Sequence, residues 1–130
     1  MPSPRPRYIR WFSELGIDDV PLVGGKNASL GEMFRELTAQ GVRVPNGFAI
    51  TAEAYRHVLD QADAWPRLHA ALDGLDARDV NDLARRALQA REIIQAARLP
   101  DDLVAEINDA HARLRCEYGE TMTLAVRSSA

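Results

Sequence analysis

The chain has 130 residues, with 16 basic and 19 acidic side chains and a net charge of −3 at pH 7. This length fits one domain or part of one, and the near balance of charge excludes nucleic acid and anionic membranes as partners held mainly by electrostatics. No apolar run approaches the ~20 residues of a membrane-spanning helix, and the one cysteine, Cys116, has no partner for an internal disulfide, so we expect a cytoplasmic protein.

The amino-terminal residues 1–7 alternate proline with polar side chains, which predicts a disordered tail. The domain is then expected over residues 8–130. It begins with apolar side chains at Tyr8–Phe12, which predict a short strand or anchor, and a second short buried strand is expected at Phe48–Ile50.

The first helical pattern begins after Lys26. Apolar side chains recur there at the spacing i, i+3, i+4 and i+7, which places them on one face of a helix. They are Leu30, Met33, Phe34 and Leu37. Asn27 is a suitable N-terminal cap, and so is Ser29 with Glu32 as a capping box. Gly41 suits the left-handed position just beyond the end of this helix.

Further helical patterns follow between residues 51 and 119. We expect Thr51 and Asp79 to cap two of them, Pro66 to occupy the first position of another, and the last to open near Pro100. Glycine ends the third and the last of the helices, at Gly74 and Gly119. The side chains predicted to face inward are Tyr55, Val58, Leu59, Leu68, Leu72, Val80, Leu83, Ala84, Ala87, Leu88, Ile94, Leu103, Ile107, Ala110 and Leu114.

The chain closes on a third strand-like segment, Leu124–Val126. One or two short strands do not make a stable sheet alone, and domains do not usually stop as they enter a new element. We therefore expect a fragment, truncated at its C-terminus, of a mostly helical α/β domain with few short strands.

The sharpest motif is Gly24-Gly25-Lys26, which holds the only lysine among 15 arginines. Paired glycines let main-chain N–H groups approach an anion, the following helix start adds unpaired donors, and a lysine supplies a compact positive charge. A Walker A loop is excluded, because Val20 stands where its first glycine belongs and Asn27 replaces its Ser or Thr. On spacing alone, a tight turn with a surface lysine is the more common explanation, because Gly-Gly-Lys is a short and frequent sequence.

Arg127 followed by Ser128 is the second candidate for phosphate binding, since arginine holds a phosphate through two hydrogen bonds and a serine hydroxyl adds a donor. A solvated loop is the alternative. The histidines His57, His69 and His111 lie on different predicted helices without metal-type spacing, so no metal ligand and no catalytic residue is assigned to this chain.

Four segments carry a more specific pattern, and in their order and spacing they resemble the phosphoenolpyruvate synthase family, the pyruvate, water dikinases. They are Leu15–Val20, Val23–Met33, Gly41–Thr51 and Leu124–Ala130. Pyruvate, phosphate dikinase and rifampicin phosphotransferase share the architecture, but the residues after Lys26 are more similar to those of the synthases.

This resemblance implies a partial ATP-grasp-like lobe, the N-terminal part of a nucleotide-binding domain. It implies that Lys26 and Arg127 bind the phosphates of ATP and stabilise the charge of phosphoryl transfer. Gly24, Gly25 and Ser128 belong to the same expected site. In the family, ATP and Mg²⁺ serve a reaction in which a phosphoryl group passes to a histidine and then to pyruvate, giving phosphoenolpyruvate, AMP and phosphate.

The chain ends before the family's magnesium ligands, phosphohistidine domain and pyruvate-binding barrel. We therefore expect those domains as its partners, and an inactive chain by itself. Two other functions remain open at this point. One is a free-standing helical binding or regulatory module without catalysis, and the other is a part of an enzyme similar to rifampicin phosphotransferase, with a different acceptor.

Overall fold

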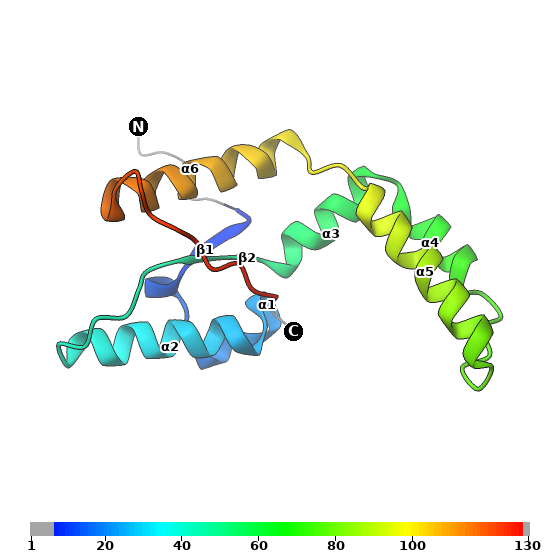
Figure 1. The fold of residues 1–130 in the computed structure, drawn as a ribbon, viewed down its shortest axis with the longest axis horizontal. Coiled ribbons are helices and arrows are strands. Elements are labelled where there is room, and N and C mark those ends of the chain that lie inside the picture. Colours follow the sequence, from blue (N-terminus) through cyan, green and yellow to red (C-terminus); the bar gives the residue numbers. More distant parts are fainter. Residues whose placement is uncertain (1–6, 129–130) are drawn as a thin grey trace. The chain divides into compact units, whose positions relative to one another are not determined.

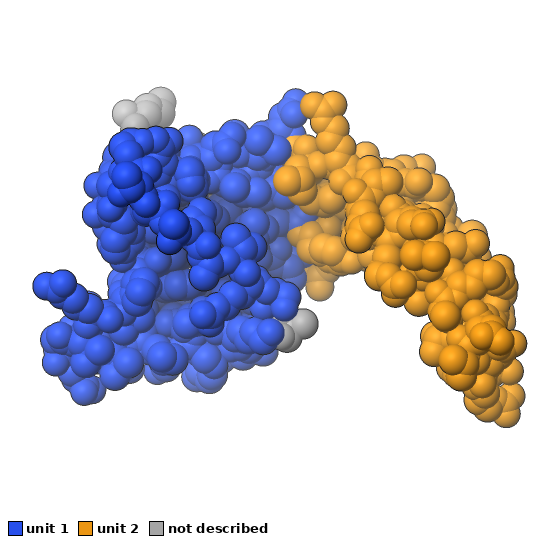
Figure 2. All heavy atoms as spheres, in the orientation of Figure 1, with its two compact units in different colours: residues 1–54, 101–130 blue, residues 55–100 orange. Residues whose placement is uncertain are grey.

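The computed structural model describes residues 7–128 and divides the chain into two compact units (Figure 2). Unit 1 combines residues 1–54 with residues 101–130, and unit 2 consists of residues 55–100. The predicted disordered tail falls almost wholly on residues 1–6, outside the described part. The division separates two units within the stretch that the sequence analysis treats as one domain.

The described residues are mostly helical, as predicted, and contain two of the three expected short strands. In chain order the elements, with short 3-10 helices labelled η, are β1 (Ile9–Trp11), η1 (Phe12–Glu14), η2 (Ile17–Asp19), α1 (Val20–Val23), α2 (Gly25–Ala39), β2 (Phe48–Ile50), α3 (Ala52–Gln61), α4 (Ala64–Leu72), α5 (Val80–Ala96) and α6 (Asp101–Tyr118).

The two strands of unit 1 pair antiparallel, with Ile9 opposite Ile50 and Trp11 opposite Phe48. Opposed residues point to the same side of a sheet, and the Trp11 and Phe48 rings accordingly lie with their centroids 5.5 Å apart. Because a two-stranded sheet is marginally stable alone, its two faces need helices packed against them.

Helices cover both faces of this sheet (Figure 1). One buried cluster joins β1 to α6 and consists of Ile9, Trp11, Ala110 and Leu114. A second cluster joins α1 and α2 to β2 and consists of Leu15, Val23, Ala28 and Ala49. Full burial of a large apolar side chain stabilises a fold by about 1.5–3 kcal/mol. The sheet thus lies between α6 and the α1–α2 pair, and the second cluster fixes the place where α2 begins.

The start of β1 is tied to α6 by Glu106. Its carboxylate accepts hydrogen bonds from the main-chain N–H of Arg7 at 2.8 Å and of Tyr8 at 2.7 Å. Near the other end of α6, the main-chain N–H of Asn46 donates to the hydroxyl of Tyr118 at 2.7 Å. Helix α6 therefore holds both the segment before β1 and the loop before β2.

Unit 2 is a pair of packed helices, α4 and α5, together with the later turns of α3 (Figure 1). Its core consists of Leu59, Ala64 and Leu68, with Ala62, Ala90, Ile93 and Ile94 packed against them. The predicted burial of Leu59 and Leu68 is confirmed. The predicted burial of Tyr55 and Leu72 is wrong, because these side chains are 50% and 43% exposed.

The predicted inward face of α5 is also wrong, except at Ile94, which packs against the core of unit 2 as predicted. No residue of this helix is buried, and Val80 and Leu88 are 74% and 50% exposed. Within unit 2, α5 turns Ala90, Ile93 and Ile94 toward the core. Apolar side chains cover much of its circumference, so more than one face satisfies helical spacing, and spacing alone does not identify the one that packs.

The third predicted strand is wrong as well. Residues 122–128 follow α6 without secondary structure, and the Val126 side chain is 92% exposed. A strand is defined by hydrogen bonds to a neighbouring strand, and no described segment pairs with this one. Its β-branched and apolar residues have the propensity for a strand but lack a partner.

The cap and glycine signals at the helix ends are confirmed, but the placement of Pro66 at the first position of its helix is wrong, because α4 begins two residues earlier, at Ala64. The Thr51 hydroxyl accepts a hydrogen bond from the main-chain N–H of Ala54 at 3.3 Å, and the Asp79 carboxylate caps α5. The glycines predicted to end helices all have positive φ. The angles are 83° at Gly41, 69° at Gly74 and 95° at Gly119. None of the helices in the described part has the length and apolarity needed to cross a membrane.

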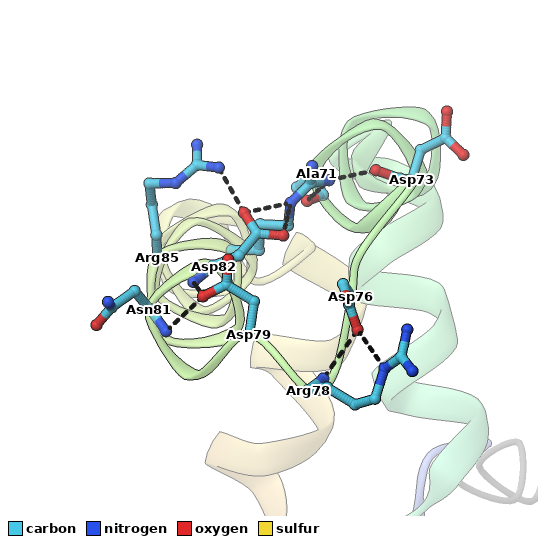
Figure 3. A network of polar contacts seen from close by, with 9 residues as sticks. Ala71, Asp73, Asp76, Arg78, Asp79, Asn81, Asp82 and Arg85 are labelled. Atoms are coloured by element: carbon cyan, nitrogen blue, oxygen red, sulfur yellow. Dashed lines mark hydrogen bonds and ion pairs between the residues drawn. The ribbon is translucent and has the colours of Figure 1, made fainter.

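A polar network joins the end of α4 to the first turns of α5 (Figure 3). Asp82 pairs with Arg86 at 3.0 Å and with Arg85 at 2.5 Å. The Arg86 guanidinium also donates to the main-chain oxygens of Ala71 and Asp73, where a helix end leaves carbonyls without intrahelical partners. The Arg86 and Asp82 side chains are only 21% and 17% exposed, so this pair is better shielded from solvent than an ordinary surface ion pair.

Acid should weaken unit 2 through Asp82. The hydrogen bond from Arg86 holds the pKa of this carboxyl below its ordinary value of 3.8, although burial acts in the opposite direction. A group whose pKa is lower in the folded state adds stability above its ordinary pKa and loses it as the pH falls through the folded-state value. We expect the free energy of unfolding of unit 2 to fall as the pH drops below about 4, and Asp82→Asn to remove that part of the fall in urea titrations.

Asp73→Asn is the matched control for this measurement. It removes an equal charge close to the network, but Arg86 contacts only the main-chain oxygen of Asp73. This variant should retain the acid-dependent loss. An Asp82→Asn protein that loses stability with acid as steeply as the wild type would contradict the role given to the ion pair.

Candidate functional site

The glycine pair of the predicted phosphate loop lies at the junction of α1 and α2. Gly24 has φ 81° and ψ 164°, in the region of backbone space that favours glycine. Its N–H donates to the Val20 oxygen at 2.8 Å, and its own oxygen accepts from the N–H of Ala28 at 3.0 Å. One residue therefore ends α1 and caps α2.

The predicted caps of α2 are wrong for this reason. Asn27 and Ser29 lie inside the helix, which begins at Gly25, and no side chain caps its start. The positive φ of Gly24 turns the chain directly from one helix into the next, so no linker with a polar cap is needed. Gly25 and Lys26 consequently occupy the first turn of α2.

The start of α2 is suited to an anion. The first N–H groups of a helix have no intrahelical acceptor, and in the described part of the chain no other group accepts from the N–H of Gly25 or Lys26. The first turn of α2 contains no acidic residue, so the partial positive charge of the helix start is not offset. A Cβ built on Gly25 meets nothing within 4 Å, which leaves the main chain open to approach.

Lys26 is exposed on this first turn. Among residues 7–128 it forms no ion pair and no hydrogen bond through its side chain. Within this part of the chain, its ammonium group therefore makes no polar contact that stabilises the fold. The structure brings Gly24, Gly25 and Lys26 together at one helix start, as their adjacency in sequence requires.

The side chain of Asn27 has a role that sequence reasoning missed. Its amide Nδ2 donates to the main-chain oxygen of Val23 at 3.0 Å, across Gly24. The sequence signal was present, since Asn commonly bonds main-chain groups a few residues away, but the motif favoured a cap.

Helix α2 is held against the chain that precedes it. The Glu32 carboxylate accepts from the N–H of Ile17 at 3.2 Å, and Arg35 donates to the Leu15 oxygen at 3.3 Å. Gly31 packs so closely that a Cβ built there would lie 2.4 Å from the Cβ of Leu15. The helix start is thus presented by a packed element rather than by a loose loop.

Arg127 and Ser128 are exposed, in the irregular segment after α6. In Figure 1 the red trace of this segment runs from α6 back past the sheet and ends near α1 in that view. Neither residue forms a hydrogen bond or an ion pair in the part that the structure describes. Their assignment to a phosphate site stays a prediction, since no contact joins them to Lys26.

Among the residues that the structure describes, neither a metal site nor a hollow lined by predicted site residues forms a second candidate site. Within the described ranges, no three His, Cys, Asp or Glu side chains lie close enough together to hold a metal ion. A shallow hollow of about 350 Å³ on unit 2 contains none of the predicted site residues. It is lined by Arg67, Ala71, Gln89, Glu92, Ile93 and Ala96.

Curated relatives match almost the whole chain. It is 49% identical over 123 residues to a phosphoenolpyruvate synthase of Pseudomonas aeruginosa, 46% identical over 125 residues to that of Helicobacter pylori, and 44% identical over 122 residues to that of Escherichia coli. These alignments cover 94–95% of this chain but only 15% of each relative. The chain therefore spans about a seventh of the length of the proteins it matches.

A protein family also matches, and it includes the candidate loop. The family described as "Pyruvate phosphate dikinase, AMP/ATP-binding domain" matches residues 20–130, which is most of the chain and begins at the first residue of α1. The chain thus belongs to the pyruvate phosphate dikinase AMP/ATP-binding domain family.

Proposed function

We propose that this chain supplies one part of the ATP-binding site of a phosphoenolpyruvate synthase. The observation that carries the proposal is the start of α2, where open main-chain N–H groups and the uncommitted ammonium of Lys26 lie on one helical turn. The names of the relatives support pyruvate as the acceptor, rather than an antibiotic, and support an enzyme rather than a free-standing regulatory module.

The chemistry of phosphoryl transfer fits these groups. The transferred phosphoryl carries spread negative charge, so catalysis depends mostly on positioning and on stabilising that charge. The N–H groups of Gly25 and Lys26 would hold phosphate oxygens of ATP, and the Lys26 ammonium would neutralise charge that develops during transfer. Arg127 and Ser128 would contact the same phosphates from the segment after α6.

The rest of the reaction belongs to other parts of the synthase. We propose an ATP-grasp architecture for the complete nucleotide-binding domain, with the phosphohistidine domain and the pyruvate-binding barrel as its partners. Mg²⁺ would accompany ATP, but the described residues do not gather a donor set for it, so no ligand and no step is assigned to the metal here. The single cysteine, Cys116, is a free thiol, which fits a cytoplasmic enzyme.

A chimeric enzyme tests this proposal. In the synthase chimera, this chain replaces the segment that it matches in the P. aeruginosa synthase. We expect the chimera to convert ATP and pyruvate into AMP and phosphoenolpyruvate. The isolated 130-residue chain should not turn over and should bind ATP weakly or not at all in calorimetry, because small-molecule sites typically bury about 70–90% of their ligand and this chain offers one wall.

Two results of these experiments would contradict different parts of the proposal. A chimera that folds but neither binds nor consumes ATP, while the parent synthase does both, contradicts the proposal. Micromolar ATP binding by the isolated chain would contradict the view that the site is completed by other domains.

A further inference from the structure

Within residues 20–28, three hydrogen bonds hold the loop that presents Lys26, and one of them comes from a side chain. Gly24 donates to Val20, Ala28 donates to Gly24, and the amide of Asn27 donates to the Val23 oxygen at 3.0 Å. The first two are main-chain bonds, which require the backbone conformation of Gly24 but no particular side chain. The third depends on the residue at position 27.

These bonds fix the peptide groups of the loop one after another. The peptide between Val23 and Gly24 is held on both sides, since its N–H bonds to Val20 and its oxygen accepts from Asn27. The next peptide, between Gly24 and Gly25, is held at its oxygen, which accepts from the N–H of Ala28. Its N–H, that of Gly25, has no acceptor among the described residues. Because a peptide is planar, the bond from Ala28 orients that N–H from within its own peptide, and the restrained Val23–Gly24 peptide positions it from the other side of Gly24.

Glycine makes the contribution of Asn27 more important. Gly24 and Gly25 have more conformational freedom than other residues, so an unrestrained loop would sample several orientations of these N–H groups. Stabilisation of a developing charge depends on donors that are already aimed before the reaction begins. The Val23 side chain is buried in the core of unit 1, so its main chain provides a fixed point to which Asn27 ties the start of α2.

We infer that Asn27 is a positioning residue for ATP, which acts by holding the Val23–Gly24 peptide and thereby aiming the N–H groups of Gly25 and Lys26. This inference rests on the proposed function. Asn27 contributes order to the loop, and the phosphate contacts themselves come from its neighbours.

Two substitutions in the synthase chimera test it. Asn27→Ala removes the donor. Asn27→Ser restores one, because a serine hydroxyl in a helix can donate to the carbonyl four residues earlier, and Val23 is four residues before position 27.

We expect Asn27→Ala to raise the KM for ATP by roughly three- to tenfold, the range that follows from the net loss of one hydrogen bond. The KM for pyruvate and the thermal unfolding transition should not change. Asn27→Ser should return the KM for ATP to within about twofold of the unsubstituted chimera.

Lys26→Ala, measured alongside, separates this inference from the proposed function. If Lys26→Ala impairs the chimera while Asn27→Ala has a normal KM for ATP, the positioning role is overturned and the proposed function stands. Equal losses in Asn27→Ala and Asn27→Ser also overturn the positioning role. If Lys26→Ala has no effect on the use of ATP, the proposed function itself fails, and the inference fails with it.

Discussion

Replacing Lys26 by alanine in the synthase chimera should lower kcat by about 10²–10³-fold, as the loss of one well-placed electrostatic donor does. The ammonium lies beside open main-chain donors at the start of α2 and has no partner in the described part of the fold. Its charge should matter more in the transition state than in the bound ground state, so the loss should appear mainly in kcat. Lys26→Arg should recover activity only in part, because the guanidinium differs in shape and reach.

Arg43→Ala is the control for this prediction. It removes the same charge from another exposed position in unit 1, outside the loop, and should leave kcat and both KM values unchanged. Neither Lys26 variant should shift the unfolding temperature appreciably, since surface substitutions away from special features usually change stability by less than about 0.5 kcal/mol. Turnover by Lys26→Ala within about threefold of the unsubstituted chimera would reduce Gly24-Gly25-Lys26 to a structural turn.

Gly31→Ala should lower the free energy of unfolding of unit 1 by about 1–3 kcal/mol, the usual cost of overpacking a core. An alanine Cβ would lie 2.4 Å from the Leu15 Cβ and 2.9 Å from the Leu15 main-chain oxygen, so the main chain itself would have to move. The sign of this change in unfolding free energy is informative, because a glycine-to-alanine substitution inside a helix otherwise stabilises the fold by up to about 1 kcal/mol. Urea unfolding of the 130-residue chain, followed by circular dichroism, measures the change.

Gly25→Ala is the matched substitution in the same helix. A Cβ at this position meets nothing within 4 Å, so the stability of unit 1 should not fall. In the synthase chimera, however, the added methyl group would occupy the space through which we propose a phosphate approaches, and ATP binding should weaken. Equal destabilisation by the two variants would contradict the close contact between Gly31 and Leu15.

The parts of the fold that could be predicted from sequence are those decided by neighbouring residues. Thr51 and Asp79 cap their helices as expected, since a cap needs only a polar side chain and the N–H groups two or three residues later. Positive φ at Gly41 and Gly119 follows in the same way, because glycine adopts that conformation at little cost.

The predictions that are wrong concern features that depend on residues far apart in the sequence. Both faces of α5 satisfy helical spacing, and the core residues of α3 and α4 decide which of them packs. The strand expected at Leu124–Val126 requires a partner strand, which sequence propensity does not provide. At the candidate site, the sequence located Gly24, Gly25 and Lys26, but it interpreted Asn27 as a cap, because the direct turn from α1 into α2 at Gly24 was not foreseen.

The hydrogen bonds from Arg7 and Tyr8 to Glu106 join residues 99 and 98 positions apart in sequence. During synthesis on a ribosome, β1 and α2 therefore emerge long before the helix that covers the other face of their sheet. Unit 2 relies on contacts between nearby segments and can fold while α6 is still being made, whereas unit 1 must first close the long loop that contains unit 2. Until then the apolar face of Ile9 and Trp11 is uncovered, so unit 1 should be the part of the nascent chain that depends on protection from aggregation.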